Sequence, residues 1–526
     1  MEENLMFKLL NCQKSFFDAP EMFGGVALDP NNYWVKMSKM IPWAEFDEEY
    51  SKNFSSNRGQ VAFSSRMALA SIFIKIHYGN ISDEGVCDLI VISPYLQYFI
   101  GLQEFVYECP FVSSTMSRFR QRITPETFAW VNDLVIAGLE ANKDSNNANT
   151  QEKTDAEASF TNTIARQALD ENSDKYDNIQ EASPTHKGIL TLDATCVPQN
   201  IAYPTDVSLL NEARQITEEV IDELHKNGFS AGKKPRTYRD RAKKEFNKFS
   251  KNKKKTAGKV RKAVRAQLLY ITRNLGHINK YVERHEKCMQ TLKTKLLERL
   301  GTAQKLYEQQ LYMYNNNTRR VDNRIVSISQ PWIRPIVRGK LKNDVEFGAK
   351  VEMSLVDGYL RVERLDFNAF NEATNLPEAI ESYREKYGYY PEKVLVDKIY
   401  RNKKNIQYCK ERGIHINGPK LGKPYADPII NKQQKLLEYQ ESIQRADIER
   451  EFGVAKTRFG LDLLTTKLKH TSEVMIHATV LYMNLRKKLR LLFCLFFRCL
   501  KSSKKIFKSI LSYPQFVNFL KMRFVQ

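Results

Sequence analysis

Several common signatures are missing from this sequence. Its eight cysteines form neither a CxxC pair nor a zinc-like spacing, which indicates free thiols in a reducing cytosol rather than a disulfide framework. The eight histidines form no HExxH or paired ligand spacing, and there is no Walker-type loop or GxSxG elbow. The most apolar stretch, residues 491–497, is far too short to span a bilayer. Nucleotide hydrolysis, serine-hydrolase chemistry and a membrane-spanning role therefore have no support.

What the sequence does contain is a large excess of positive charge. Lysine and arginine number 82 against 61 aspartates and glutamates, a formal net charge of +21. Such an excess favours nucleic acid or an anionic membrane surface as partner, but says nothing about the fold. At 526 residues the chain is long enough for two or three domains with sizeable cores.

The positive charge is densest within residues 232–255, inside a long helical region predicted for residues 206–320. Lysine and arginine runs suit contact with a phosphate backbone, and Tyr238, Phe246 and Phe249 offer rings for stacking. A solvated charged helix is the alternative interpretation. The charge density and the shortage of balancing acids favour nucleic acid. The residues predicted to contact DNA here are Lys233, Lys234, Arg236, Arg239, Arg241, Lys253 and Lys254.

Residues 55–135 are predicted to form a compact helical unit. Its expected helices cover residues 66–76, run from a Ser82 cap to Ile90, and cover residues 113–122. Short helices with a late basic one suit a helix-turn-helix-like module, in which Arg118 and Arg120 would contact DNA. A helical packing domain with a solvated basic face fits the same pattern equally well.

The rest of the chain alternates predicted strands and helices. The expected elements are a strand at 188–195, a hairpin of strands at 345–355 and 360–367 turning at Asp357-Gly358, a helix at 376–387, a strand ending at Asp397, a helix at 402–412, a short strand at 414–417, and a helix at 433–458. Without the insertion, the order is strand, hairpin, helix, strand, helix, strand, helix. This is the order expected of a ribonuclease-H-like fold.

Three acidic residues occupy settings that suit a metal site. Asp193 and Asp397 each end an apolar run, and Glu449 lies in the last predicted helix. In a ribonuclease-H-like sheet the first and fourth strands are parallel neighbours, so the two aspartates would meet and the final helix would present Glu449 to them. Hard oxygen ligands suit Mg²⁺, the metal that phosphoryl transfer prefers. Taken singly, such residues are usually caps or solvated side chains; three in this order are harder to explain that way.

Helical geometry predicts the surroundings of Glu449. Arg445, Glu449 and Lys456 fall within a narrow arc of the helix. Glu451 lies about 200° away round the same helix and is expected to meet solvent or a surface lysine. The residues of the neighbouring apolar stripe, which should bury against the sheet, are Ile448, Phe452, Ala455 and Phe459.

Several of these segments carry a family resemblance. They are residues 192–195 with 203–206 and 209–211, residues 346–350, residues 396–400, the pattern Arg445-x3-Glu449-x6-Lys456, and in the N-terminal unit residues 66–76, 101–102 and 113–120. Together they resemble the DDE transposases of bacterial insertion sequences, most closely the insertion-sequence-five superfamily and its longer members with a helical insertion. The Arg, Glu and Lys match the family's Y-R-E-K signature, whereas Ser442 stands where the tyrosine would fall.

The resemblance implies an enzyme that binds the terminal inverted repeats of its own element, cuts there and joins the ends to target DNA. Asp193 would bridge two Mg²⁺ ions, for which Mn²⁺ can substitute, while Asp397 and Glu449 would each complete one metal site. Arg445 and Lys456 would hold phosphates near the scissile bond. The implied partners are double-stranded DNA and at least one further copy of the chain, with no membrane, in a bacterial cytoplasm beside the nucleoid. Two alternatives remain open: a ribonuclease-H-like nuclease without strand transfer, and a non-catalytic DNA-binding regulator derived from a transposase.

The predicted fold class is α+β and multidomain. We expect a helical N-terminal DNA-binding domain at residues 1–140, a polar linker at 141–187, a ribonuclease-H-like catalytic domain at 188–205 and 321–480, a basic helical insertion at 206–320, and a basic and apolar helical tail at 481–526.

Overall fold

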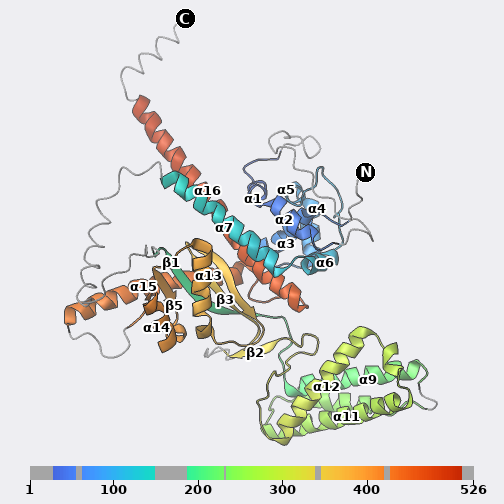
Figure 1. The fold of residues 1–526 in the computed structure, drawn as a ribbon. Coiled ribbons are helices and arrows are strands. Elements are labelled where there is room, and N and C mark those ends of the chain that lie inside the picture. Colours follow the sequence, from blue (N-terminus) through green and yellow to red (C-terminus); the bar gives the residue numbers. More distant parts are fainter. Residues whose placement is uncertain are drawn as a thin grey trace.

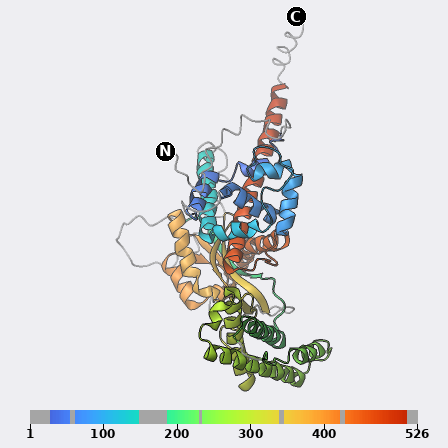
Figure 2. The same ribbon diagram turned by 90° about the vertical axis from the view of Figure 1, so that its right-hand side faces the viewer.

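The computed structural model describes residues 28–54, 62–147, 186–229, 233–337, 345–419 and 427–511 (Figure 1). Most of the predicted polar linker, residues 148–185, lies outside these ranges, as do the last residues of the predicted tail. The described residues form helices at the N-terminus, a mixed sheet with helices on both faces, and a separate helical lobe, in agreement with the predicted α+β class (Figures 1 and 2).

Serine side chains cap the start of some of the N-terminal helices. The Ser64 side chain accepts a hydrogen bond from the backbone N–H of Met67, and Ser82 accepts one from Gly85, so the predicted cap at Ser82 is confirmed. The helices are α1 (Tyr33–Ser38), α2 (Trp43–Ser51), α3 (Ser65–His77), α4 (Asp83–Ile92), α5 (Pro94–Phe99), α6 (Thr115–Arg122) and α7 (Pro125–Asn147).

The sheet has the strand order that the sequence predicts. Its strands are β1 (Ile189–Pro198), β2 (Arg334–Val337), β3 (Val345–Val356), β4 (Tyr359–Asp366), β5 (Lys393–Val396) and β6 (His415–Ile416). The order across the sheet is β4-β3-β1-β5-β6, with β1, β5 and β6 parallel and β3 antiparallel to both β1 and β4. The first and fourth predicted strands, β1 and β5, are therefore neighbours, as expected of the ribonuclease-H-like order.

The hairpin between β3 and β4 follows from its turn residues. Asp357 and Gly358 both have positive φ, 52° and 77°. Two consecutive positive φ values define the turn type that matches the twist of a two-residue hairpin, which Asp-Gly favours. Strand β2 was not predicted; it pairs with the first residues of β3 and contains Pro335.

Helices cover both faces of the sheet. On one face, α13 (Leu376–Tyr387) and α14 (Lys403–Glu411) share a core with Leu192 of β1 and Val394 of β5. On the other face, α15 (Pro428–Phe459) and α16 (Lys469–Leu511) pack with Met353 of β3. Alternate residues of each strand point to opposite faces, so both cores are built from the same strands.

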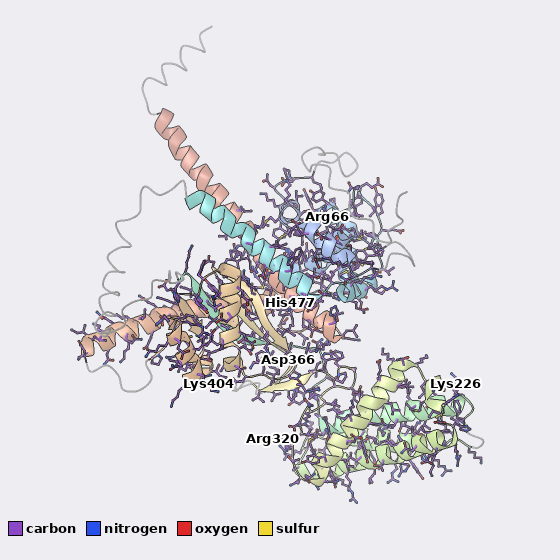
Figure 3. The ribbon with its side chains drawn as sticks, viewed as in Figure 1. Arg66, Lys226, Arg320, Asp366, Lys404 and His477 are labelled. Atoms are coloured by element: carbon purple, nitrogen blue, oxygen red, sulfur yellow. The ribbon has the colours of Figure 1, made fainter. Side chains whose placement is uncertain are left out.

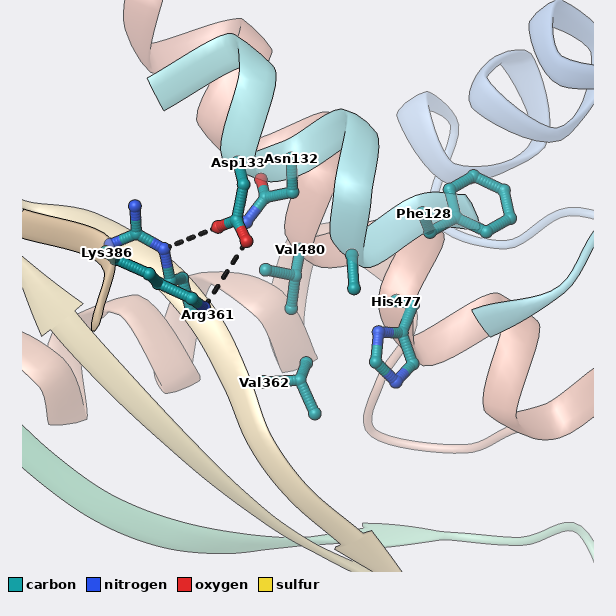
Figure 4. A pocket seen from close by; sticks show the side chains of 9 residues that line it. Phe128, Asn132, Asp133, Arg361, Val362, Lys386, His477 and Val480 are labelled. Carbon is teal, nitrogen blue, oxygen red and sulfur yellow. Dashed lines mark hydrogen bonds and ion pairs between the residues drawn. The ribbon is translucent and has the colours of Figure 1, made fainter. Parts of the chain in front are cut away.

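The N-terminal helices are docked on this second face. Asn132 of α7 donates a hydrogen bond to the carbonyl of Leu360 in β4 (3.0 Å). Asp133 pairs with Arg361 of β4 at 2.7 Å and with Lys386 of α13 at 3.3 Å (Figure 4). One continuous core runs from α3 through α16 to β3. The predicted N-terminal unit is therefore joined to the sheet by a packed interface.

The insertion is a helical lobe with its own core. It contains α9 (Asp206–Lys226), α10 (Arg239–Ser250), α11 (Ala257–Arg284) and α12 (Thr294–Asn315). Thr205 caps α9 in a reciprocal arrangement with Ser208. Lys226 and Arg320 lie toward opposite ends of this lobe (Figure 3).

Two helices cross predicted domain boundaries. Helix α7 continues past residue 140 to Asn147, and α16 runs unbroken through residues 480 and 481. The other boundaries stay predictions. Within the described ranges, none of the helices is both long enough and apolar enough to cross a membrane.

Candidate active site

Asp193 lies at the point where β1 loses its parallel neighbour. The last paired residues of β1 and β5 are Leu192 and Val396, so Asp193 and Asp397 each follow directly after the last pair. The sequence predicted a strand at residues 188–195, with Asp193 near its end. Strand β1 instead continues to Pro198, because β3 still pairs with it there. The Asp193 carboxylate accepts a hydrogen bond from the backbone N–H of Ala194 (2.8 Å).

Asp397 precedes a short 3₁₀ turn, Lys398–Tyr400, and its side chain is exposed. The backbone N–H of Tyr400 donates to the Asp397 carbonyl at 3.0 Å, which closes this turn. The negative charge of Asp397 contributes to raising the pKa of Asp193. The end of β5 therefore holds the second aspartate beside the first, as predicted.

Helix α15 brings Arg445 and Glu449 to the same place. One guanidinium nitrogen of Arg445 lies 2.9 Å from a carboxylate oxygen of Glu449, and the other lies 3.7 Å from Asp193. Arg445 thus links the strand aspartate to the helical glutamate. The Glu449 side chain is 51% exposed, and Lys456 is half-buried on the same helix.

The predicted phase of α15 is confirmed by its buried residues. These include the whole predicted stripe, Ile448, Phe452, Ala455 and Phe459. Glu451 lies toward α16 and is half-buried. Its surroundings include Lys487, Arg486 and Arg490 of α16, and burial raises its pKa against the opposing effect of these positive charges.

The pKa of the Asp193 carboxyl is perturbed by its surroundings. Burial raises the pKa of Asp193 to about 6; the Ala194 N–H and Arg445 oppose this rise, whereas Glu372 and Asp397 add to it. A site with a buried carboxyl among other acids favours the binding of a cation, because positive charge stabilises the ionised form.

The donor set fits a hard divalent metal. Asp193, Asp397 and Glu449 offer only carboxylate oxygens, the ligands that Mg²⁺ prefers. Within the part of the chain that the structure describes, no three acidic, histidine or cysteine side chains lie close enough together to hold a metal ion. Arg445 instead supplies positive charge between Asp193 and Glu449.

The sequence did not predict the role of Glu352, a buried carboxylate that is linked to the turn after Asp397. Glu352 of β3 is fully buried and accepts hydrogen bonds from the Tyr400 hydroxyl (2.6 Å) and the Asn375 amide (2.9 Å). Tyr400 therefore ties the turn after Asp397 to the centre of the sheet. The available signal was a glutamate between Val351 and Met353, inside the hairpin strand predicted at residues 345–355.

Lys350 and Glu372 form a second unpredicted pair. The Lys350 ammonium lies 2.7 Å from a Glu372 carboxylate oxygen and donates to the Phe370 carbonyl at 2.7 Å. Glu372 is the first of the two acids that raise the pKa of Asp193. Lys350 belongs to the segment 346–350 that carries the family resemblance. The sequence did not predict that its partner is Glu372.

The two N-terminal candidates, Arg118 and Arg120, differ in their exposure. Arg120 is buried, and its guanidinium makes two hydrogen bonds to the Asp83 carboxylate, at 2.9 and 2.6 Å. Its charge is therefore paired inside the helical unit, and its predicted contact with DNA stays a prediction. Arg118, two residues earlier on α6, is exposed.

The candidates of the insertion divide into two groups. Three have acidic partners: Lys234 and Arg239 both pair with Asp222, and Arg241 pairs with Glu245. These three charges are therefore balanced by local ion pairs, although acids are few in the segment as a whole. The other four candidates, Lys233, Arg236, Lys253 and Lys254, are exposed, and so are the paired Lys234 and Arg241.

Comparison with known proteins agrees with this arrangement. Residues 394–486 match the family described as "Transposase DDE domain", and residues 26–122 match a family described as "Transposase domain". A curated protein of Rhizobium meliloti, "Uncharacterized protein ORF8 in nfe locus", is 29% identical over 189 residues, which cover 36% of this chain and 72% of that protein. No solved structure matches the chain.

The two matches cover segments that carry predicted site residues and N-terminal helices. The DDE match contains Asp397, Arg445, Glu449 and Lys456, and the second match contains most of the N-terminal helices. Both matches agree with the predicted recognition: residues 394–486 are similar to a transposase DDE domain and residues 26–122 to a second transposase domain.

Proposed function

We propose that this chain is a transposase that binds the terminal inverted repeats of an insertion sequence, cuts the DNA strand at their ends and transfers the freed end to target DNA. Asp193, Asp397 and Glu449 would hold two Mg²⁺ ions. The observation that carries the proposal is the position of Arg445, which contacts both Asp193 and Glu449 beside the strand that ends at Asp397.

The chain's own residues have distinct tasks in this proposal. Bound divalent metal would stabilise charge on the attacking and leaving oxygens of an in-line displacement. The half-exposed Glu449 and exposed Asp397 leave their carboxylates open to ligands. Once the carboxylates are neutralised, the planar fork of Arg445 becomes available to grip a phosphate through two hydrogen bonds. Lys456 would add a point charge farther along the same helix.

The insertion would supply the longest DNA contact. Residues 239–273 contain fourteen lysines and arginines against two acids. Arg239 and Arg241 are paired with acids, while Lys253, Lys254 and many neighbours are exposed on α10, α11 and the segment between them. Such a surface suits sequence-independent contact with phosphates. Exposed Arg118 would add a contact from the N-terminal helices.

Asp193→Asn tests the catalytic assignment. The variant should lose Mg²⁺-dependent nicking of a labelled duplex that carries the inverted repeat flanking the gene, because it removes one metal ligand. Its affinity for that duplex should remain nearly unchanged. The matched control is Asp206→Asn, which alters an aspartate that binds Arg324 (2.6 Å) at the start of α9 and should leave nicking intact.

Product analysis separates the proposed function from its alternatives. A transposase should convert nicked ends into covalent joints with a second duplex. A nuclease would nick and never join, and a regulator would bind the repeat without either reaction. Cutting by the Asp193→Asn variant would show that the metal assignment is wrong.

A further inference from the structure

Helix α15 extends beyond the body of the protein before it reaches the active site (Figure 1). Its first buried residue is Glu441, which contacts His415 of β6 at 2.6 Å. All residues from 428 to 440 are exposed or half-buried. These thirteen residues correspond to about 20 Å of helix. A single helix of this length is marginally stable in water.

The projecting part carries an ordered apolar surface, which we call the α15 stripe. Its members are Ile429, Leu436, Tyr439 and Ile443, between 48% and 68% exposed. They are spaced by seven, three and four residues, the spacing of the contact positions of a coiled coil. The half-buried Gln434 and Leu437 lie on the side of the helix that faces away from the stripe.

Charge indicates which partner fits the stripe. Residues 427–444 contain two lysines and three acids, whereas the chain as a whole carries a net charge of +21. A nearly neutral, apolar segment has little to offer a polyanion. Two copies of so basic a chain repel each other over most of their surfaces, so this segment is where a second copy can approach at low electrostatic cost.

We propose that the α15 stripe is the contact between two copies of this chain, packed as a pair of helices. Arg445 lies two residues after Ile443, and Glu449 follows one turn later on the same helix. Pairing would therefore stabilise the helix that presents both residues to Asp193. This coupling to cutting rests on the proposed function, whereas the self-association does not.

The test measures the mass of the full chain in solution. The wild-type chain should sediment as a dimer at micromolar concentration. The double variant Leu436→Glu, Tyr439→Glu should be monomeric at that concentration, with a dimer dissociation constant at least tenfold higher than that of the wild type. The control is Ile92→Glu, at the 73% exposed end of α4, which should remain a dimer with an unchanged dissociation constant.

Hydrogen exchange provides a second readout that does not depend on a variant. Amides of residues 428–440 should exchange more slowly as protein concentration rises. A wild-type monomer at all concentrations, or a double variant that still dimerises, would overturn the proposal. Protection that is independent of concentration would also overturn it, because another segment of the same chain would then cover the stripe.

The proposed self-association and the proposed DNA cutting can be tested independently of each other. Asp193→Asn should dimerise like the wild type, since Asp193 is not part of the stripe and its side chain, on a strand of the sheet, is only 15% exposed. If the stripe variant alone loses dimerisation but the wild type never nicks DNA, the interface stands and the proposed function does not.

Discussion

Replacing Tyr400 with phenylalanine removes one hydroxyl from the centre of the molecule. That hydroxyl is one of two donors to the fully buried carboxylate of Glu352. A hydrogen bond to a charged group contributes about 1.5–3 kcal/mol, and the buried acceptor has no water to replace it. The ring itself keeps its packing. We therefore expect the local free energy of opening to fall by about 2 kcal/mol.

Hydrogen exchange of the β1 and β3 amides measures this loss. Two kcal/mol corresponds to exchange about thirtyfold faster. Tyr107→Phe, which removes the same atom from a side chain that is 86% exposed, is the control and should leave exchange unchanged. DNA nicking by Tyr400→Phe should fall less than with Asp193→Asn, because the turn after Asp397 is loosened while every proposed ligand remains.

The effect of Tyr400→Phe should depend on pH. Burial raises the pKa of Glu352, opposed by the hydrogen bonds from Tyr400 and Asn375. Because the folded pKa is above the unfolded value, this group costs stability as pH rises above the unfolded pKa. Removing the hydroxyl enlarges that cost, so the difference from wild type should grow as pH rises through the folded pKa and shrink in acid. A difference below about 0.5 kcal/mol at neutral pH, equal to a surface change, would refute the reasoning.

Two further predictions concern charge. Asp83→Asn should destabilise the N-terminal helices by about 3 kcal/mol, since it leaves buried Arg120 without its ionic partner. Burial would raise the pKa of Asp83, but Arg120 and Lys75 lower it overall. The stability from this ion pair is therefore present above the unfolded pKa of Asp83 and is lost as pH falls through the folded pKa. Equal melting temperatures of variant and wild type at pH 7 would contradict this prediction. Neutralising the lysine run should weaken binding to all DNA sequences alike and flatten the plot of log affinity against log salt by roughly 0.9 per lost contact. An unchanged slope would mean that the run is only solvated; the lysines to change are Lys251, Lys253, Lys254 and Lys255.

Local signals explain which parts of the fold the sequence could predict. The Asp357-Gly358 turn has both residues at positive φ, a requirement that few residue pairs meet. Gly388 ends α13 at a φ of 78°, where glycine is favoured. The apolar spacing of α15 predicted its buried face because helical geometry alone determines that periodicity.

Features that depend on distant partners could not be predicted. The burial of Arg120 was not predicted because its partner, Asp83, is 37 positions away in the chain. β1 extends past Asp193 because β3 pairs with it, more than 150 residues later. Glu451 looked exposed because only the packing of α16 places Lys487 and Arg486 nearby. In each case the local pattern predicted the helix or strand, and a tertiary contact then determined an environment that the pattern could not predict.

The central claim is that Glu449 completes a site with Asp193 and Asp397. The most direct measurement compares Mg²⁺-dependent nicking by Glu449→Gln and Glu451→Gln, two identical changes two residues apart on α15, with folding checked by thermal melting. Glu449 is linked through Arg445 to Asp193, whereas Glu451 lies among the basic residues of α16. Glu449→Gln should lose cutting by several orders of magnitude while Glu451→Gln cuts nearly normally. A dead Glu451 variant beside an active Glu449 variant would contradict the assignment.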